Sequence, residues 1–183
     1  LLLVAFAVLA CLAAVFSIMK GSVEIPLEEI LGAMAGEQGT HAQILMNIRL
    51  PRTIVALLVG VNLALSGAIL QAVMKNPLAD PHIIGISSGA GLTGILVMLL
   101  LPEYGALVTP AAFVGALGAA VLIYILAWKN GIRPVRIILA GVAVSAFLGA
   151  GISALMIIYS DRVHSALLFM VGGLSARSWP HVA

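Results

Sequence analysis

Residues 105–128 read GALVTPAAFVGALGAAVLIYILAW, a run with no charged side chain that ends at Lys129. Crossing the ~30 Å hydrocarbon core of a bilayer takes about 20 mostly apolar residues, at ~1.5 Å of rise per residue. This run is long enough. Because water is absent from the hydrocarbon, each backbone N–H and C=O must be satisfied within the segment, so we expect a membrane-spanning α-helix.

The same pattern recurs along the whole chain. Four further apolar runs of spanning length, each flanked by charged residues or a chain end, cover residues 1–19, 53–74, 83–101 and 137–160. Residues 163–174 are apolar but about half the required length, which favours an interfacial or re-entrant helix. We therefore predict an all-α, polytopic transmembrane helix bundle, with residues 1–183 forming a single membrane domain.

Composition supports lipid as the solvent. The 183 residues are 62% hydrophobic and 9% charged, whereas soluble domains carry about 25% charged residues. The net charge of +2 comes from scattered residues without a block of one sign, which argues against nucleic-acid binding. The chain begins inside an apolar run and ends just after Trp179, a residue suited to anchor a sixth span, so we expect a piece of a longer protein.

Small residues are frequent inside the expected spans. In lipid, close helix contact depends on small side chains that let backbones approach, and we assign this packing role to Gly60, Gly67, Gly85 and Gly89. The interiors of the spans hold no acidic or basic residue. Because proton relays and voltage sensors need such groups, ion-coupled transport by this part of the protein is disfavoured.

Several motifs argue against other kinds of site. Residues 89–94 spell GxGxxG, but they lie inside an apolar span without the strand or the acidic residue of a dinucleotide site. No GxxxxGK[ST] occurs, so the chain has no P-loop for ATP. The four histidines lack metal-ligand spacing, and Cys11 is the only cysteine, so we expect no metal, no cofactor and no catalytic residue in this chain.

Two polar side chains, Asn62 and Gln71, lie within the second expected span. Interhelical hydrogen bonds of about 1 kcal/mol each account for them. Lining of a translocation pathway is the alternative.

Arg49-Leu50-Pro51-Arg52 stands at the start of the second span. Pro51 suits the first turn of a helix, and arginines three residues apart at that position can face one direction and offer fork-shaped donors to carboxylates. Contact with lipid phosphates at the membrane edge is the other reading.

The loop after this span holds Asn76, Pro77, Asp80 and Pro81, a set that predicts a compact, non-helical turn. The small residues that follow, 85–90, allow an unwound or tightly packed start to the third span. The loop at 128–137 carries Lys129, Arg133 and Arg136 without an acidic residue. Its charge favours the cytoplasm for both loops.

At these residues the sequence resembles the FecCD family, the permeases of ATP-binding-cassette importers for iron-siderophore, haem and cobalamin. The resemblance runs through Ile48-Arg49-Leu50-Pro51-Arg52, Ser66-Gly67, Gln71, residues 76–81 and residues 85–90, and continues more weakly to Trp179. Lys75, Phe169 and Gly173 depart from the family pattern. About five of the family's ten spans are represented, as in its N-terminal half.

The resemblance implies an architecture and a set of partners. A second permease subunit, two ATPase subunits that use ATP and magnesium, and an extracytoplasmic binding protein would assemble with the chain in the bacterial cytoplasmic membrane. It implies that Arg49 and Arg52 engage acidic residues of the binding protein and that residues 76–81 shape the inner mouth. The fifth span and residues 163–174 would form the pathway-lining helix and outer gate.

The expected function is alternating-access transport of a metal chelate with no chemistry on the cargo. An ion-coupled secondary transporter or channel is the alternative; a membrane-embedded enzyme and a purely structural scaffold are weaker rivals.

Overall fold

The computed structural model describes residues 1–21, 23–37, 39–129, 131, 133–175 and 177–182. Every regular element in these ranges is helical, which confirms the predicted all-α class. The chain divides into two compact units, one of residues 1–63 and 174–183 and the other of residues 64–173. The division falls inside one long helix, and each unit is described by itself.

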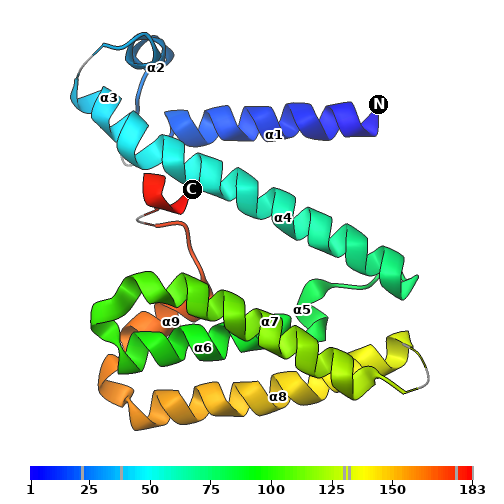
Figure 1. Ribbon diagram of the computed structural model, residues 1–183. Helices are drawn as coiled ribbons and strands as arrows, with labels where there is room; N and C mark the ends of the chain where they lie inside the picture. Colours follow the sequence, from blue (N-terminus) through cyan, green and yellow to red (C-terminus); the bar gives the residue numbers. More distant parts are fainter. Residues whose placement is uncertain (22, 38, 130, 132, 176, 183) are drawn as a thin grey trace. The chain divides into compact units, whose positions relative to one another are not determined.

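The first unit contains α1 (Leu2–Met19), α2 (Leu27–Met34), α3 (Thr40–Ile44) and the first part of α4 (Leu50–Met74). A π-helical turn, η1 (Leu45–Arg49), joins α3 to α4, and a 3-10 turn, η4 (Trp179–His181), lies near the C-terminus. The end of α1 lies beside η1 (Figure 1). A small apolar core forms between α2 and η1 from Ile25, Ile30, Ala33 and Leu45.

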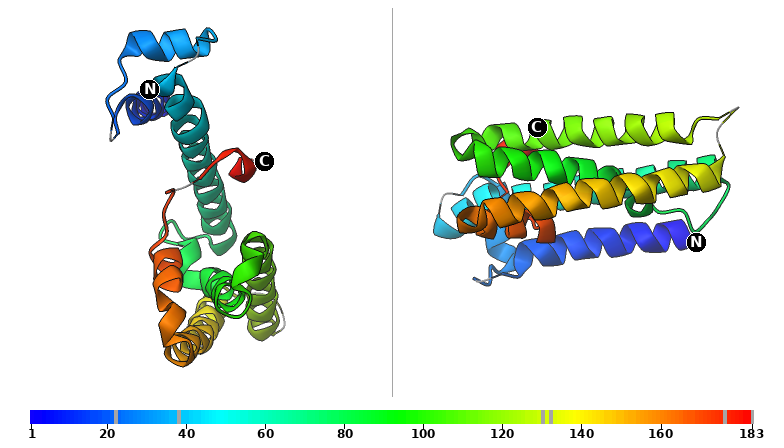
Figure 2. Two further views of the ribbon diagram at one scale, coloured as in Figure 1. Left: turned by 90° about the vertical axis from the view of Figure 1, so that its left-hand side faces the viewer. Right: turned by 90° about the horizontal axis from the view of Figure 1, so that it is seen from below.

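The second unit contains the rest of α4, then α5 (Pro81–Ile84), α6 (Ile86–Leu100), α7 (Val108–Ala127), α8 (Pro134–Ile158) and α9 (Val163–Val171). Two 3-10 turns, η2 (Pro102–Leu107) and η3 (Ser160–Arg162), precede α7 and α9. Helices α6, α7 and α8 run side by side, as Figures 1 and 2 both show. In this second unit, a buried apolar cluster joins α6, α8 and α9 through Ile95, Leu99, Ile152 and Ala166.

The helices differ in places from the predicted spans. In the described part of the chain, four helical segments are long and apolar enough to cross a membrane: Leu2–Met19, Thr40–Met74, Pro102–Ala127 and Pro134–Ile158. The third predicted span, 83–101, is divided at Gly85 into α5 and the shorter α6, which has 15 residues. The fifth predicted span, 137–160, corresponds to α8, which begins at Pro134 and ends at Ile158. The short helix predicted at 163–174 corresponds to α9, which ends at Val171.

Pro51 does not start a helix, contrary to the prediction, because helical structure is continuous from Thr40 to Met74. The π-helical turn before Pro51 accommodates it: the N–H of Leu50 donates to the carbonyl of Leu45, five residues earlier. A local widening of this kind is a known response to a proline inside a helix.

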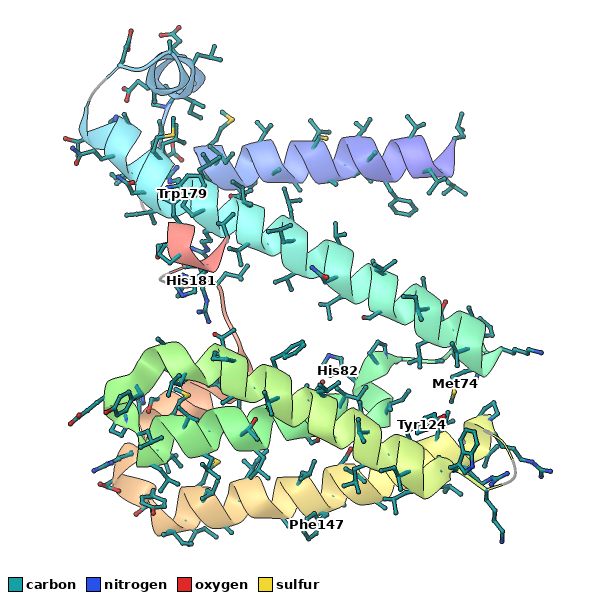
Figure 3. All side chains as sticks on the ribbon, viewed as in Figure 1. Met74, His82, Tyr124, Phe147, Trp179 and His181 are labelled. Carbon is teal, nitrogen blue, oxygen red and sulfur yellow. The ribbon has the colours of Figure 1, made fainter. Side chains whose placement is uncertain are left out.

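Many large apolar side chains remain exposed on both units. Phe147, labelled in Figure 3, points from α8 away from α6 and α7 and is 75% exposed. Helix α1 has no buried residue at all among those described. Such surfaces are typical of helices whose solvent is lipid or which pack against further helices.

Candidate functional site

Arg49 occupies a buried position at the end of the π-helical turn. Its side chain is only 8% exposed. One guanidinium nitrogen, Nη1, donates to the backbone carbonyls of Ile18 and Met19 at 2.7 and 2.9 Å, and Nη2 donates to the carbonyl of Val23. The last carbonyls of a helix have no intrahelical donor, so the guanidinium caps the C-terminus of α1.

Arg52, three residues later, has a different environment. Its side chain is exposed and makes no hydrogen bond or ion pair with any residue that the structure describes. The two neighbouring arginines therefore differ in burial and in hydrogen bonding, and their role in docking a binding protein stays a prediction. The carbonyls at the end of α1 attract one guanidinium into the protein and leave the other free.

Further polar contacts surround this end of α4. Ser17 and Thr53 hydroxyls lie 3.2 Å apart and join α1 to α4, and Thr53 is buried. Lys20 pairs with Glu24, four residues later, and this hydrogen bond, together with the lysine's charge, lowers the pKa of the Glu24 carboxyl. These contacts hold the C-terminal end of α1 and the residues that follow it, up to Glu24, against the start of α4.

Trp179 contacts the same turn from a distant part of the sequence. Its indole Nε1 donates to the carbonyl of Met46 at 3.0 Å, and Figure 3 shows its side chain beside the start of α4. In the π pattern the carbonyl of Met46 would pair with residue 51, but proline has no N–H. The indole therefore satisfies an acceptor that Pro51 leaves unpaired. This contact could not be predicted from the sequence, where Pro51 is compatible with the start of a helix.

The turn after α4 is stabilised by its own side chains. Asn76 Oδ1 accepts from the N–H of Leu78 at 2.9 Å, and Asp80 Oδ1 accepts from the N–H of His82 at 2.8 Å. Asp80 is the N-cap of α5, and Pro81 follows in its first turn, as both residue types favour. Pro77 lies inside the turn. These contacts make the turn rigid and local, and none of them forms a ligand site.

Gly85 breaks the helix between α5 and α6. Its φ of 84° lies in the left-handed region, which favours glycine. A Cβ atom at this position would lie 2.9 Å from the carbonyl oxygen of Gly141 and closer still to the Ser145 hydroxyl on α8. Backbone conformation and close approach both require glycine here.

Gly89 and Gly115 bring α6 and α7 into backbone contact. A Cβ at either residue would lie under 3.0 Å from the other's carbonyl oxygen. Beside them, Thr93 Oγ1 donates to the carbonyl of Ala111 on α7 at 2.8 Å. By contrast, a Cβ at Gly60 or Gly67 on α4 would meet nothing within 4 Å in the described part of the chain. Their packing role stays a prediction.

Asn62 and Gln71 are the two amide side chains of α4. The amide of Asn62 donates to the carbonyl of Leu58 on its own helix at 2.8 Å, and both side chains are exposed. They are nine residues apart on α4, and at about 100° per residue they lie on opposite faces. Their possible role in lining a translocation pathway stays a prediction.

Helix α9 packs on α6. Ala166 is fully buried, and the ring of Phe169 fills the space that Gly94 leaves, since a Cβ there would lie 2.8 Å from the ring. Arg162, just before α9, donates to the carbonyl of Leu99 at the end of α6 at 3.0 Å. Within the described ranges, no three His, Cys, Asp or Glu residues are placed to hold a metal ion.

Comparisons with known proteins agree with this architecture. The Fe(3+)-citrate import system permease protein YfmE of Bacillus subtilis is 38% identical over 177 residues, covering 96% of this chain and 53% of YfmE. The cobalamin import system permease protein BtuC of Halobacterium salinarum is 42% identical over 149 residues, covering 80% of this chain and 40% of that protein.

A solved structure is also similar. It is that of a metal-chelate type ABC transporter in an inward-facing conformation, with a TM-score of 0.83 and 28% identity, and the match covers 99% of this chain and 56% of the other.

The apolar helices and the permease relatives together define a multi-pass membrane protein of the transporter class. The family model of the FecCD transport family matches residues 8–183, and the chain belongs to this family. It spans about half the length of the curated relatives that it matches.

Proposed function

We propose that this chain is part of the permease of an ATP-binding-cassette importer for metal chelates such as ferric siderophores, haem or cobalamin. The observation that carries the proposal is the family match across residues 8–183, with an inward-facing metal-chelate transporter as a structural relative. The named cargoes of two relatives, ferric citrate and cobalamin, are bulky metal complexes. The chain acts by moving its cargo and performs no reaction on it.

Energy for transport comes from other chains. The sequence has no P-loop, and α1, α6 and α7 contain no charged residue that could couple transport to an ion gradient. Two ATPase subunits that bind ATP and magnesium would drive alternating access of a pair of permease subunits. An extracytoplasmic binding protein would deliver the chelate.

The charged residues at the ends of the helices support one orientation in the bacterial cytoplasmic membrane. Lys129, Arg133 and Arg136 flank the connection between α7 and α8, where the sequence holds no acidic residue, as is typical of cytoplasmic loops. The start of α4, with Arg52, would then face outward. The turn at residues 76–81 would lie inside, and α9 would form part of the outer gate.

Reconstitution with its ATPase and binding protein tests the proposed function. We expect proteoliposomes to accumulate radiolabelled ferric citrate or cobalamin only when ATP is present, and ionophores that collapse ion gradients should have no effect. Uptake that follows an imposed proton or sodium gradient without ATP would instead identify a secondary transporter.

We further propose that Arg52 contacts acidic residues of the binding protein, and reversing its charge tests this docking role. Arg52→Glu should weaken binding about tenfold or more at low salt, because charges at the rim of an interface steer association. The difference should shrink as salt is added. Arg133→Glu, an equal change at the start of α8, is the control and should leave docking unchanged. Equal affinities of the Arg52 variant and the native protein would refute docking at this residue.

A further inference from the structure

The connection between α7 and α8 carries positive charge that the described part of the chain does not neutralise. Lys129, Arg133 and Arg136 lie in it or beside it, and the sequence holds no acidic residue between Glu103 and Asp161. None of the three basic side chains pairs with a carboxylate among the described residues. Their charge is therefore available to an anion from outside this unit.

One of the three basic residues holds the connection in a defined shape. Arg136 donates from Nη1 to the carbonyl of Lys129 at 2.6 Å, so the first turn of α8 is bound to the chain just beyond the end of α7. The side chains of Lys129 and Arg133 remain exposed. Because α8 begins directly after Arg133, the partial positive charge of a helix N-terminus adds to theirs.

Two aromatic side chains lie at the same end of α7. The rings of Tyr124 and Trp128 are 5.4 Å apart between centroids, and their planes are inclined by 43°. The two residues are 50% and 56% exposed, and Figure 3 shows Tyr124 where the end of α7 adjoins the start of α8. Such residues gather at the membrane surface, because their rings suit the acyl chains and their O–H and N–H groups suit the headgroups.

The lengths of the two helices place this end at the surface of the bilayer. Helix α7 has 20 residues and α8 has 25, and at ~1.5 Å of rise per residue each is long enough to cross about 30 Å of hydrocarbon. Large apolar side chains stay exposed up to Ile125 and Leu126, and charged residues begin at Lys129. The basic residues therefore lie at the level of the lipid phosphates.

We propose that Tyr124, Trp128, Lys129 and Arg133 form a binding site for the headgroup of an anionic phospholipid. The guanidinium of Arg133 can donate two parallel hydrogen bonds to phosphate oxygens, and Lys129 supplies a second full charge. The exposed rings contact the glycerol and upper acyl-chain region of the same lipid. An acidic protein surface would match the charges but would leave these rings without a function, so the rings favour a lipid.

This site is independent of the cargo and of the energy source. In the proposed orientation its lipid belongs to the cytoplasmic leaflet. The bound lipid would fix the height of α7 and α8 in the membrane through Lys129 and Arg133 together.

Titration of the intact permease with lipids tests the site. The purified protein in detergent is mixed with short-chain phosphatidylglycerol, with phosphatidylcholine of the same chain length, or with inorganic phosphate, and native mass spectrometry counts the bound molecules at each concentration. Phosphatidylglycerol should bind most tightly. Phosphatidylcholine, whose headgroup has no net charge, should bind about tenfold more weakly. Inorganic phosphate lacks acyl chains and should not displace phosphatidylglycerol at an equal concentration.

Substitutions at the site separate its charges from its rings. Lys129→Gln and Arg133→Gln should each weaken binding of phosphatidylglycerol about fivefold, and the double variant about 25-fold, since each basic residue near an anionic lipid contributes about 1 kcal/mol. Added salt should weaken binding to the native protein more than to the double variant. Trp128→Leu keeps the charges and should weaken the binding of both lipids.

Lys75→Gln is the matched control. Lys75 is also an exposed basic residue just after a helix of the same unit, and its loss should leave the affinity for phosphatidylglycerol nearly unchanged. All substituted side chains of the test are exposed, and an unchanged elution volume in gel filtration shows that each variant remains folded.

Three results would overturn the proposal. They are equal affinity of the native protein for the two lipids, equal affinity of the native protein and the double variant for phosphatidylglycerol, and displacement of the lipid by inorganic phosphate at an equal concentration. If the double variant also loses its ATPase subunits while it binds phosphatidylglycerol as the native protein does, the basic connection is a protein contact and the lipid site is refuted.

Discussion

The end of α1 and the contacts of α6 with its neighbours show two ways of joining helices. At the end of α1, one long cationic side chain reaches three carbonyls and fixes the segment that follows. Between α6 and α7, and where Gly85 meets α8, the absence of side chains lets backbones touch. The first depends on a charge near a helix end, and the second depends on missing volume. The two should therefore respond to different substitutions.

The chemistry of each place explains the difference. A guanidinium can compensate the free carbonyls at a helix terminus, where the backbone has polar groups to offer. In the middle of α6 and α7 the backbone pairs within each helix, so attraction in lipid comes from close packing and from side-chain hydrogen bonds such as that from Thr93 to Ala111. Only small residues such as Gly89 and Gly115 permit this packing.

The largest effect is expected where two backbones touch. Gly115→Ala would place a Cβ under 3.0 Å from both Thr93 Oγ1 and the carbonyl oxygen of Gly89, and overpacking against backbone costs about 3 kcal/mol. Gly118→Ala on the same helix is the control, since its Cβ would meet no described atom within 4 Å. Unfolding in mixed detergent micelles measures both. Equal stability of the two variants would show that α6 and α7 are not packed through Gly115.

An intermediate effect is expected at the break between α5 and α6. Gly85→Ala combines the strain of a left-handed backbone with a clash against α8, and we expect a loss of about 2 kcal/mol. Gly131 also has positive φ, at 102°, but its surroundings are open within the described chain. Gly131→Ala therefore measures the strain alone and should cost about 1 kcal/mol. A cost at Gly131 as large as that at Gly85 would remove the need for a contact with α8.

The smallest effect concerns the pair of Lys20 and Glu24 after α1. The hydrogen bond and charge of Lys20 lower the pKa of Glu24 in the folded protein. The pair therefore stabilises the segment above the ordinary pKa range of a carboxyl group, and this contribution is lost as pH falls through the lowered pKa. The native protein should lose its slight advantage in thermal stability over Glu24→Gln under acidic conditions. A difference that does not vary with pH would contradict this assignment.

Much of the fold could be predicted because lipid imposes a simple rule. Runs without charge had to be helices, and a charged residue such as Lys129 marked where one of them stops. The turn that contains Asn76 and Asp80 could also be predicted from the sequence, because short polar side chains and prolines determine it locally. The division of the third span at Gly85 was only hinted at by the small residues around it.

The different environments of the two arginines could not be predicted. Spacing alone placed Arg49 and Arg52 on one face of a helix, but the environment of Arg49 is decided by carbonyls some thirty residues earlier, in α1. Likewise, nothing in the local sequence indicates that Trp179 donates to Met46. Contacts between segments distant in sequence need the folded chain.

The hydrogen bond from Trp179 to Met46 makes two remote positions depend on one another. Because Pro51 has no N–H, the carbonyl of Met46 accepts its hydrogen bond from the indole of Trp179 instead. Trp179→Phe should therefore destabilise the native protein. The same substitution should be nearly neutral beside Pro51→Ala, which restores a backbone donor. In evolutionary terms this is epistasis: the residue tolerated near the end of the chain is set by a single imino acid far upstream.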